Sequence, residues 1–301
     1  MYIVGIVHRT IRNQRRVRGT RPTKLSMVKM AKNIYIGEIL KNEEIRQDYF
    51  LMKVALPDSF DEPQPGQFVM IRIAGLYDPF LSRPLSIYSF SRGRSNCSIE
   101  LLYRVVGKGT QILAGLIKGS QVEVHGPLGG SYKVFPEKEN IVFIAGGIGV
   151  APLSLLAHYL CKKACFPQSQ MSFYLGAQTA GAIVGLDKLS RLCYNLQICT
   201  DDGTLGRKSL VTQDFQKDIK KYDPVSTTVY ACGPRGMLKA LAGILELKKF
   251  PCQVSLEERM ACGTGACMGC AVAVKDQQGN VAYKRVCSDG PVFDLEDVIW
   301  E

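Results

Sequence analysis

The chain has 301 residues, of which 46% are hydrophobic and 22% charged, enough for a sizeable core shared among one to three domains. No run of about 18 apolar residues occurs, so the sequence predicts no transmembrane helix. The formal net charge of +11 resides mainly in residues 1–33, which hold nine Lys and Arg and no Asp or Glu, so the remaining chain carries only +2. A strongly basic folded body is therefore excluded.

Residues 1–32 are predicted to be a basic N-terminal extension, either disordered or a translation artefact. Met27 and Met30 stand just before the first strand-like segment, which favours an artefact over residues 1–26. Binding of the tail to nucleic acid or to a membrane is an alternative. An organellar transit peptide fits less well, because Ser26 is the only serine in that stretch. We therefore expect no nucleic-acid partner and no membrane partner.

Short strand-like segments separated by turn residues fill residues 33–135. Branched and aromatic residues lie between polar ones, and the expected strands span residues 34–40, 49–56, 67–73, 97–106 and 121–125. One short helix is expected at residues 110–116. This regular spacing predicts a small antiparallel β-barrel.

Two motifs in this barrel are candidates for holding a pyrophosphate. Arg83-Pro-Leu-Ser86 is expected at the end of a strand, where the guanidinium can pair with phosphates and the serine can hydrogen-bond a flavin ring. Leu102-Tyr-Arg104 is followed by Gly107-Lys-Gly-Thr110, whose glycines can form an anion-binding nest at a helix start. Simple exposed turns are the alternative for both.

Residues 136–250 change character. Apolar strands are expected at residues 140–145, 171–177, 196–200 and 227–231, and helices at 153–161 and 236–249. Alternating strands and helices predict a parallel sheet covered on both faces.

Two loops of this sheet are candidates for binding a dinucleotide. Gly146-Gly-Ile-Gly-Val-Ala-Pro152 follows a buried strand and opens a helix, as a pyrophosphate loop requires, although Pro152 departs from the G-x-G-x-x-G pattern. Cys232-Gly-Pro234 again ends a strand, and such loops share one edge of the sheet. The Cys232 thiol can touch a nicotinamide there, or it can be a buried, inert cysteine. A plain strand–helix turn is the alternative for the first loop.

Four cysteines near the C-terminus, in residues 251–301, carry the most specific pattern. Cys262, Cys267, Cys270 and Cys287 follow the C-x4-C-x2-C…C order of plant-type [2Fe–2S] ligands, within a loop rich in glycine. Structural zinc is an alternative, but it usually needs a second C-x2-C pair or histidines. Disulfides suit a secreted chain better.

Seven other cysteines are scattered, and most are expected to be small buried hydrophobic residues. Because no secretory signal is recognised, a reducing cytoplasm is the expected compartment. The seven cysteines outside the cluster pattern are Cys97, Cys161, Cys165, Cys193, Cys199, Cys232 and Cys252.

These motifs occur in one order, and together they resemble the ferredoxin–NADP reductase superfamily. More narrowly, residues 33–301 resemble the electron-transfer subunit of the dihydroorotate dehydrogenase class that uses NAD. The resemblance implies FAD in the barrel, NAD in the α/β domain and a [2Fe–2S] cluster at the C-terminus. It implies contacts with FAD from Arg83, Pro84, Leu85, Ser86, Leu102, Tyr103, Arg104, Gly109 and Thr110. The superfamily usually has Tyr where this chain has Leu85, and the basic tail has no counterpart.

The resemblance further implies electron transfer between NAD and an FMN-containing dihydroorotate dehydrogenase catalytic subunit, in a heterotetramer of two copies of each chain and in pyrimidine biosynthesis. The expected contacts with NAD come from Gly146, Gly147, Gly149, Pro152, Asp201, Cys232, Gly233 and Pro234. The acidic pair Asp201-Asp202 favours NAD over NADP, since it would repel a 2′-phosphate. Arg207 and Lys208 follow closely but are expected to face solvent.

Two other functions stay open at this point. The same parts can build a reductase subunit that passes electrons from NAD(P)H to sulfur compounds or to another oxidoreductase. A redox-sensing protein that uses the basic tail on nucleic acid is a more distant alternative.

Overall fold

The structure is a computed structural model that describes residues 34–75, 78–193 and 195–300. The predicted basic extension, residues 1–32, lies outside these described residues. No helix among the described residues is long and apolar enough to cross a membrane.

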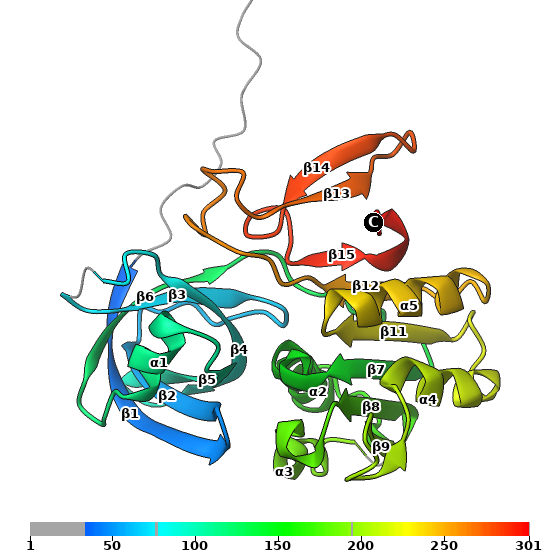
Figure 1. Cartoon of the computed structure of the whole chain (residues 1–301), viewed down its shortest axis with the longest axis horizontal. Coiled ribbons are helices and arrows are strands. Elements are labelled where there is room, and N and C mark those ends of the chain that lie inside the picture. Colours follow the sequence, from blue (N-terminus) through cyan, green and yellow to red (C-terminus); the bar gives the residue numbers. More distant parts are fainter. Residues whose placement is uncertain (1–33, 76–77, 194, 301) are drawn as a thin grey trace, which may run out of the picture. The chain divides into compact units, whose positions relative to one another are not determined.

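The first six strands close into an antiparallel barrel in the order β1-β2-β5-β4-β3-β6 (Figure 1). Alternate residues of each strand face the barrel interior, so Ile99, Leu101 and Tyr103 of one strand share a core. The predicted barrel is therefore confirmed. Its elements are β1 (Ile34–Arg46), β2 (Tyr49–Pro57), β3 (Phe68–Ile73), β4 (Arg83–Arg92), β5 (Asn96–Arg104), α1 (Lys108–Ala114) and β6 (Gln121–Leu128).

A seven-stranded sheet follows, in the order β10-β9-β8-β7-β11-β12-β15. All neighbouring strands are parallel except β15, which runs antiparallel to β12 at one edge. The predicted parallel sheet is thus confirmed. Its strands are β7 (Asn140–Gly146), β8 (Met171–Ala177), β9 (Asn195–Thr200), β10 (Arg207–Lys208), β11 (Thr227–Cys232), β12 (Cys252–Ser255) and β15 (Val292–Asp294).

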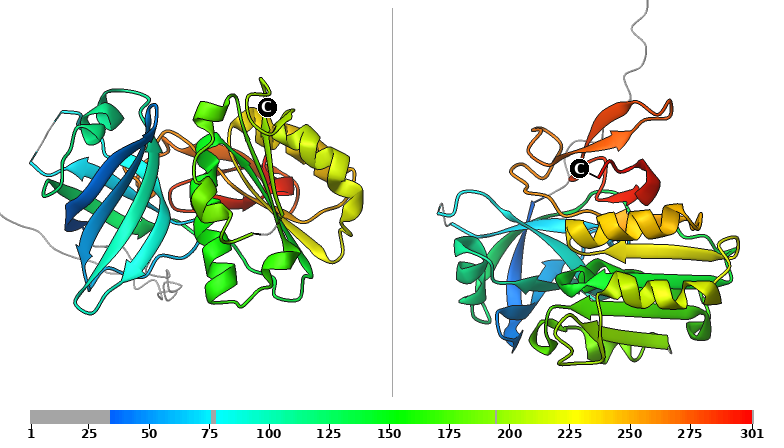
Figure 2. Two further views of the ribbon diagram at one scale, coloured as in Figure 1. Left: turned by 90° about the horizontal axis from the view of Figure 1, so that it is seen from below. Right: turned by 45° about the vertical axis from the view of Figure 1, so that its right-hand side comes forward.

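Helices cover both faces of this sheet (Figure 2). On one face α2 (Val150–Lys162) and α3 (Leu186–Leu189) pack with Phe143 of β7. On the other face α4 (Val211–Asp218) and α5 (Arg235–Glu246) pack with Ile144, the next residue of the same strand. A strand buried on both faces needs apolar residues at every position, which explains the continuous apolar segment at residues 141–145.

The C-terminal segment leaves this sheet and returns to it. The cysteine loop follows β12 and leads into a two-stranded antiparallel sheet of β13 (Ala271–Lys275) and β14 (Val281–Arg285), after which β15 pairs with β12. The sequence analysis placed residues 251–301, and with them β12 and β15, in one segment with the four cysteines. In the structure, the hydrogen bonds of β12 and β15 join them to the seven-stranded sheet.

The barrel contacts the nucleotide sheet through α2 and α3. Tyr88 of β4 and Leu102 of β5 belong to the same hydrophobic cluster as Leu153 of α2. Lys188 of α3 donates a hydrogen bond from Nζ to the carbonyl oxygen of Tyr88 at 2.8 Å, and its Nζ lies 3.8 Å from the centre of the Tyr88 ring. These contacts place the barrel beside the carboxyl edge of the parallel strands.

Candidate cofactor-binding sites

A pocket of about 820 Å³ opens at the carboxyl ends of the parallel strands, where ligands bind in open α/β sheets. The barrel contributes Asp48, Tyr49 and Arg104 to its lining, and Arg104 lies over the Tyr49 ring. The remaining wall comes from the loops that follow the strands of the sheet and from residues of α4 and α5. The pocket therefore lies between the barrel and the parallel sheet.

The glycine loop after β7 provides one wall of this pocket. Gly146 and Gly147 line the pocket, and Gly147 has φ +53°. Gly149 faces away from it, since a Cβ atom there would lie 2.2 Å from the carbonyl oxygen of Cys232. Pro152 is buried in the first turn of α2, where a proline is tolerated. Two of the four predicted residues thus reach the pocket, and the other two shape the loop.

The loop after β11 lies against the glycine loop. Gly233 and Pro234, two of the residues expected to contact NAD, line the pocket. The side chain of Cys232 is only 1% exposed, and burial raises the pKa of its thiol well above the ordinary value. The thiol therefore lies beneath the loop, which favours the buried, inert interpretation over contact with a nicotinamide.

The loop after β9 carries the predicted acidic pair. Asp201 lines the pocket, and its N–H donates to the carbonyl oxygen of Ala177 at 3.0 Å. Asp202 instead accepts hydrogen bonds from the hydroxyl and N–H of Thr204 at 2.7 and 2.9 Å, and these bonds lower its pKa. Asp201 therefore faces the pocket, whereas Asp202 is engaged within its own loop.

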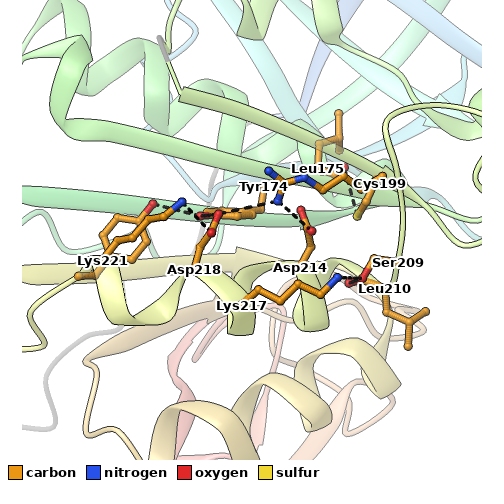
Figure 3. A network of polar contacts seen from close by, with 11 residues as sticks. Tyr174, Leu175, Cys199, Ser209, Leu210, Asp214, Lys217, Asp218 and Lys221 are labelled. Atoms are coloured by element: carbon orange, nitrogen blue, oxygen red, sulfur yellow. Dashed lines mark hydrogen bonds and ion pairs between the residues drawn. The ribbon is translucent and has the colours of Figure 1, made fainter.

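Arg207 is exposed, as expected, but it also makes ion pairs that the sequence did not predict. Its side chain is 51% exposed, yet Nη1 lies 3.2 Å from Oδ1 of Asp214 on α4 and 4.0 Å from Oδ2 of Asp218. Figure 3 shows both carboxylates in a polar network with Tyr174 of β8. The sequence offers no local signal for this pairing, because the partners lie seven and eleven positions further along the chain.

The pocket also contains residues that the sequence did not identify. Gln178 and Thr179 follow β8, and the rule that located the other loops would have found them. Met237 and Glu257 come from α5 and from the segment after β12. Desolvation in the cleft raises the pKa of Glu257 above its ordinary value. The sequence placed Glu257 in the segment that leads to Cys262, and no local pattern indicated that its carboxylate lies at the nucleotide pocket.

The predicted flavin motif brings Arg83 and Gly109 together. A Cβ atom on Gly109 would lie 2.1 Å from Nε of Arg83, so only glycine leaves room for the guanidinium. Arg83 also donates from Nη1 to the carbonyl oxygen of Leu81 at 2.8 Å. It begins β4 rather than ending a strand, which corrects the predicted placement. A guanidinium beside a glycine backbone fits the pyrophosphate of a dinucleotide such as FAD.

The other predicted flavin residues divide between the surface and the core. Pro84 and Ser86 are half-buried, and Arg104 is exposed at the pocket. Leu85 and Tyr103 are buried in the barrel core, where the Tyr103 hydroxyl donates to Asn42 at 3.0 Å. Leu102 packs toward α2. Thr110 is buried, and its hydroxyl bonds with the backbone of Val106 and Gly107 in its own loop.

The four predicted cluster cysteines come together as two pairs. The Sγ atoms of Cys262 and Cys267 lie 3.4 Å apart, and the N–H of Cys287 points to Sγ of Cys270 at 3.4 Å. The described residues contain no compact group of three or more metal-ligating side chains around one point. Two pairs suit a cluster with two irons, each bound by two cysteines, better than a single tetrahedral zinc ion.

Backbone N–H groups already point at the sulfurs of this loop. Cys262 accepts from the N–H of Cys267 at 3.4 Å and of Thr264 at 3.5 Å. Burial raises the pKa of the Cys262 thiol, but these hydrogen bonds lower it by more. The resulting pKa is about 6, below the ordinary value of a cysteine. The loop thus favours the thiolate form that binds iron, and the residues present fit a [2Fe–2S] cluster.

Two glycines fix this loop against its surroundings. Gly263 has φ +68°, and a Cβ atom there would lie 2.4 Å from Cγ of Met70 on β3. Gly265 has φ +83°, and its carbonyl oxygen accepts a hydrogen bond from Nη1 of Arg285 at 2.6 Å. The cysteine loop therefore lies directly on the barrel and is tied to the segment that carries Cys287.

Three family models match successive segments of the chain. Residues 37–132 match the oxidoreductase FAD-binding domain, residues 143–242 match the oxidoreductase NAD-binding domain, and residues 257–299 match the iron-sulfur cluster binding domain of dihydroorotate dehydrogenase B. The predicted cofactor set of FAD, NAD and an iron–sulfur cluster is therefore confirmed at the level of these domains.

Full-length relatives and a solved structure extend the similarity. The dihydroorotate dehydrogenase B (NAD(+)) electron transfer subunit of Desulforamulus reducens is 36% identical, covering 89% of this chain and 99% of the relative. The subunit of the same name from Geobacillus kaustophilus is 39% identical over 78% of this chain and 87% of its own. The structure of an NADH-dependent reduced ferredoxin-NADP oxidoreductase is 29% identical with a TM-score of 0.74, over 88% of this chain and 90% of its own. The chain accordingly belongs to the family of dihydroorotate dehydrogenase B (NAD(+)) electron transfer subunits.

Proposed function

We propose that this chain passes electrons between NAD and a partner subunit that oxidises dihydroorotate, in pyrimidine biosynthesis. Family membership and the three cofactor domains support this function. FAD, when bound, exchanges a hydride with nicotinamide and single electrons with an iron–sulfur cluster. The task of the protein is then to place the bound groups at the right distances.

The observation that carries the proposal is that one barrel contacts both other sites. Tyr49 and Arg104 at one end of the barrel help to line the nucleotide pocket. Met70 on β3 packs against Gly263 of the cysteine loop. A flavin held by this barrel would therefore lie between the nucleotide and the cluster, which is the order that electron transfer between them requires.

The predicted residues that lie at a candidate site have these roles in the proposal. Arg83 and Gly109 would hold the FAD pyrophosphate, and Arg104 would close the barrel side of the nucleotide pocket. Cys262 and Cys267 would bind one iron of the cluster, while Cys270 and Cys287 would bind the other. The residues that would hold NAD are Gly146, Gly147, Asp201, Gly233 and Pro234.

The surface beside the cluster supports a partner contact. Met268, the residue after Cys267, is 59% exposed, and Tyr283 of β14 is 66% exposed. Large apolar side chains at such exposure are typical of protein interfaces. The proposed partner is an FMN-containing catalytic subunit, two copies of which would assemble with two copies of this chain in the cytoplasm.

The test is co-expression with a candidate catalytic chain, followed by purification through a tag on this chain. The complex should contain FMN, FAD and iron, and should reduce NAD when dihydroorotate is added. Replacing Met268 and Tyr283 with Asp should release the partner while this chain keeps its FAD. A stable complex that holds flavin and iron but fails to oxidise dihydroorotate would contradict the proposal.

A reductase subunit for another NAD(P)H-linked oxidoreductase is the second candidate. The 29% identity with an NADH-dependent reduced ferredoxin-NADP oxidoreductase favours it, since that similarity also covers 88% of this chain. The chains that co-purify with this protein from its own cells distinguish the two functions. A partner without FMN, or one that reduces ferredoxin or a sulfur compound, would favour this candidate.

A further inference from the structure

The acidic end of β9 has a cation beside it that the proposed function does not use. Strand β10 runs parallel to β9 and pairs Arg207 with Cys199 and Lys208 with Thr200, the residue before Asp201. With about 4.8 Å between strands and about 3.3 Å per residue, the Cα atoms of Arg207 and Asp201 lie about 8 Å apart. An extended arginine side chain spans that distance, so Arg207 is within reach of a phosphate at the Asp201 end of the pocket.

The structure directs Arg207 elsewhere. Its guanidinium faces α4, with Nη1 3.2 Å from Oδ1 of Asp214 and 4.0 Å from Oδ2 of Asp218. Lys208 extends to the opposite face of the strand, because successive side chains alternate. Arg207 is not among the residues that line the nucleotide pocket, whereas Asp201 is.

Asp214 is the stronger of the two partners. Its side chain is 1% exposed, and Oδ2 has no hydrogen-bond partner in the described part of the chain. Withdrawing Arg207 would leave that buried carboxylate without its cation, which is strongly unfavourable. Asp218 depends less on Arg207, since it also accepts from the Tyr174 hydroxyl at 3.0 Å and pairs with Lys221 at 2.7 Å (Figure 3).

We propose that Asp214, assisted by Asp218, is a positioning residue for nucleotide specificity that holds Arg207 away from the pocket. Asp201 then remains the charge that meets the ribose 2′ position, so a 2′-phosphate is repelled. This inference rests on the proposed function, because it assumes that NAD binds at the end of β9. Discrimination against NADP then depends on the Arg207–Asp214 ion pair outside the pocket as well as on Asp201 inside it.

The test compares the binding of 2′,5′-ADP and of 5′-AMP to the purified full chain by calorimetry. Asp214→Asn should tighten 2′,5′-ADP at least tenfold, or about 1.4 kcal/mol, and change 5′-AMP by less than threefold. Asp218→Asn should give a smaller change in the same direction. This variant provides the test if Asp214→Asn, at the buried position, impairs folding. Arg207→Met alone should leave the ratio of the two affinities unchanged.

The double variant Asp214→Asn with Arg207→Met tests whether the released arginine causes the tighter binding of 2′,5′-ADP. In this variant the ratio of the affinities for 2′,5′-ADP and 5′-AMP should return to the wild-type value. A gain that persists without Arg207 would overturn the inference, as would an unchanged ratio in folded Asp214→Asn and Asp218→Asn variants. If the wild-type chain binds neither 5′-AMP nor NADH, the proposed function fails together with the inference. If it binds both and the ratio stays constant, only the inference fails.

Discussion

Among the cluster cysteines, the sulfurs of Cys262 and Cys270 accept hydrogen bonds from backbone N–H groups of the C-terminal segment. Cys287 is buried beside Cys270, and its own N–H donates to the sulfur of that residue. Cys287→Ser should therefore remove most of the iron and leave FAD in place, because the barrel does not depend on this loop for its closure. Iron analysis and the visible spectrum give the measurement.

A matched control for that variant is Cys252→Ser. Cys252 is also buried, but it lies in β12 of the parallel sheet and outside the cysteine loop. The Cys252→Ser variant should keep its full iron content even if the buried serine hydroxyl lowers the melting temperature of the protein. Full iron in Cys287→Ser would show that the fourth ligand is wrongly assigned.

Gly149 shows how one residue holds two loops together. A Cβ atom there would lie 2.2 Å from a backbone oxygen of Cys232, which no side-chain rotation can relieve. Gly149→Ala should lower the free energy of unfolding by about 1–3 kcal/mol. Gly243→Ala on α5, where nothing lies within 4 Å of the added atom, should raise it by about 0.5–1 kcal/mol. Denaturant unfolding of both variants checks the contrast, and equal effects would refute it.

At the scale of elements, the Arg285 side chain joins β14 to the cysteine loop. Arg285 donates from Nη1 to Gly265 at 2.6 Å, and from Nε and Nη2 to the Asp289 carboxylate at 3.2 and 3.4 Å. Lysine offers one ammonium group and cannot make this fork of bonds. Arg285→Lys and Arg285→Gln should therefore both release iron to a chelator about tenfold faster than the wild type.

The control for this element is Lys284→Gln. Lys284 is the neighbouring exposed residue on β14, and its side chain lies on the other face of the strand. It should release iron at the wild-type rate. If Arg285→Gln also does so, the bond to Gly265 does not stabilise the loop.

At the scale of the whole molecule, Lys188 links the nucleotide sheet to the barrel. Burial lowers its pKa to about 8, while Glu100 opposes that shift. Because the folded state binds fewer protons than the unfolded state between pH 8 and about 10.5, the unfolding free energy should rise with pH across this window. Below pH 8 the lysine is charged in both states, and no such dependence is expected.

Lys188→Met isolates this contribution, since it keeps an apolar stem over the Tyr88 ring without the charge. The stability of the wild type relative to Lys188→Met should increase by about 1–2 kcal/mol from pH 8 to pH 10, as measured by denaturant unfolding at each pH. A difference that stays constant or shrinks over this range would contradict a lowered pKa for Lys188. His158, Lys162 and Asp187 lie nearby in both proteins, so their titration cancels to first order.

The sequence by itself determined the parts of this protein. Alternation with period two in residues 34–125, and continuous apolar strands from residue 140, were sufficient for a barrel followed by a parallel sheet. The spacing of Cys262, Cys267 and Cys270 indicated the cluster, because the ligands of one loop must be close in the sequence. Such local patterns depend on neighbours within a few residues, so they remain readable without the fold.

Only the tertiary structure decided which side chains face a site. Gly149 and Cys232 carry recognised motifs, yet they pack against each other, 83 positions apart, beneath the pocket. Glu257 belongs by sequence to the segment before the cluster cysteines, yet it lines the nucleotide pocket. Arg207 is held by Asp214 on α4, and β12 and β15 join the nucleotide sheet on either side of the cysteine loop. These contacts arise when separate elements pack, and the packing depends on the shapes and charges of segments that no local pattern relates to one another.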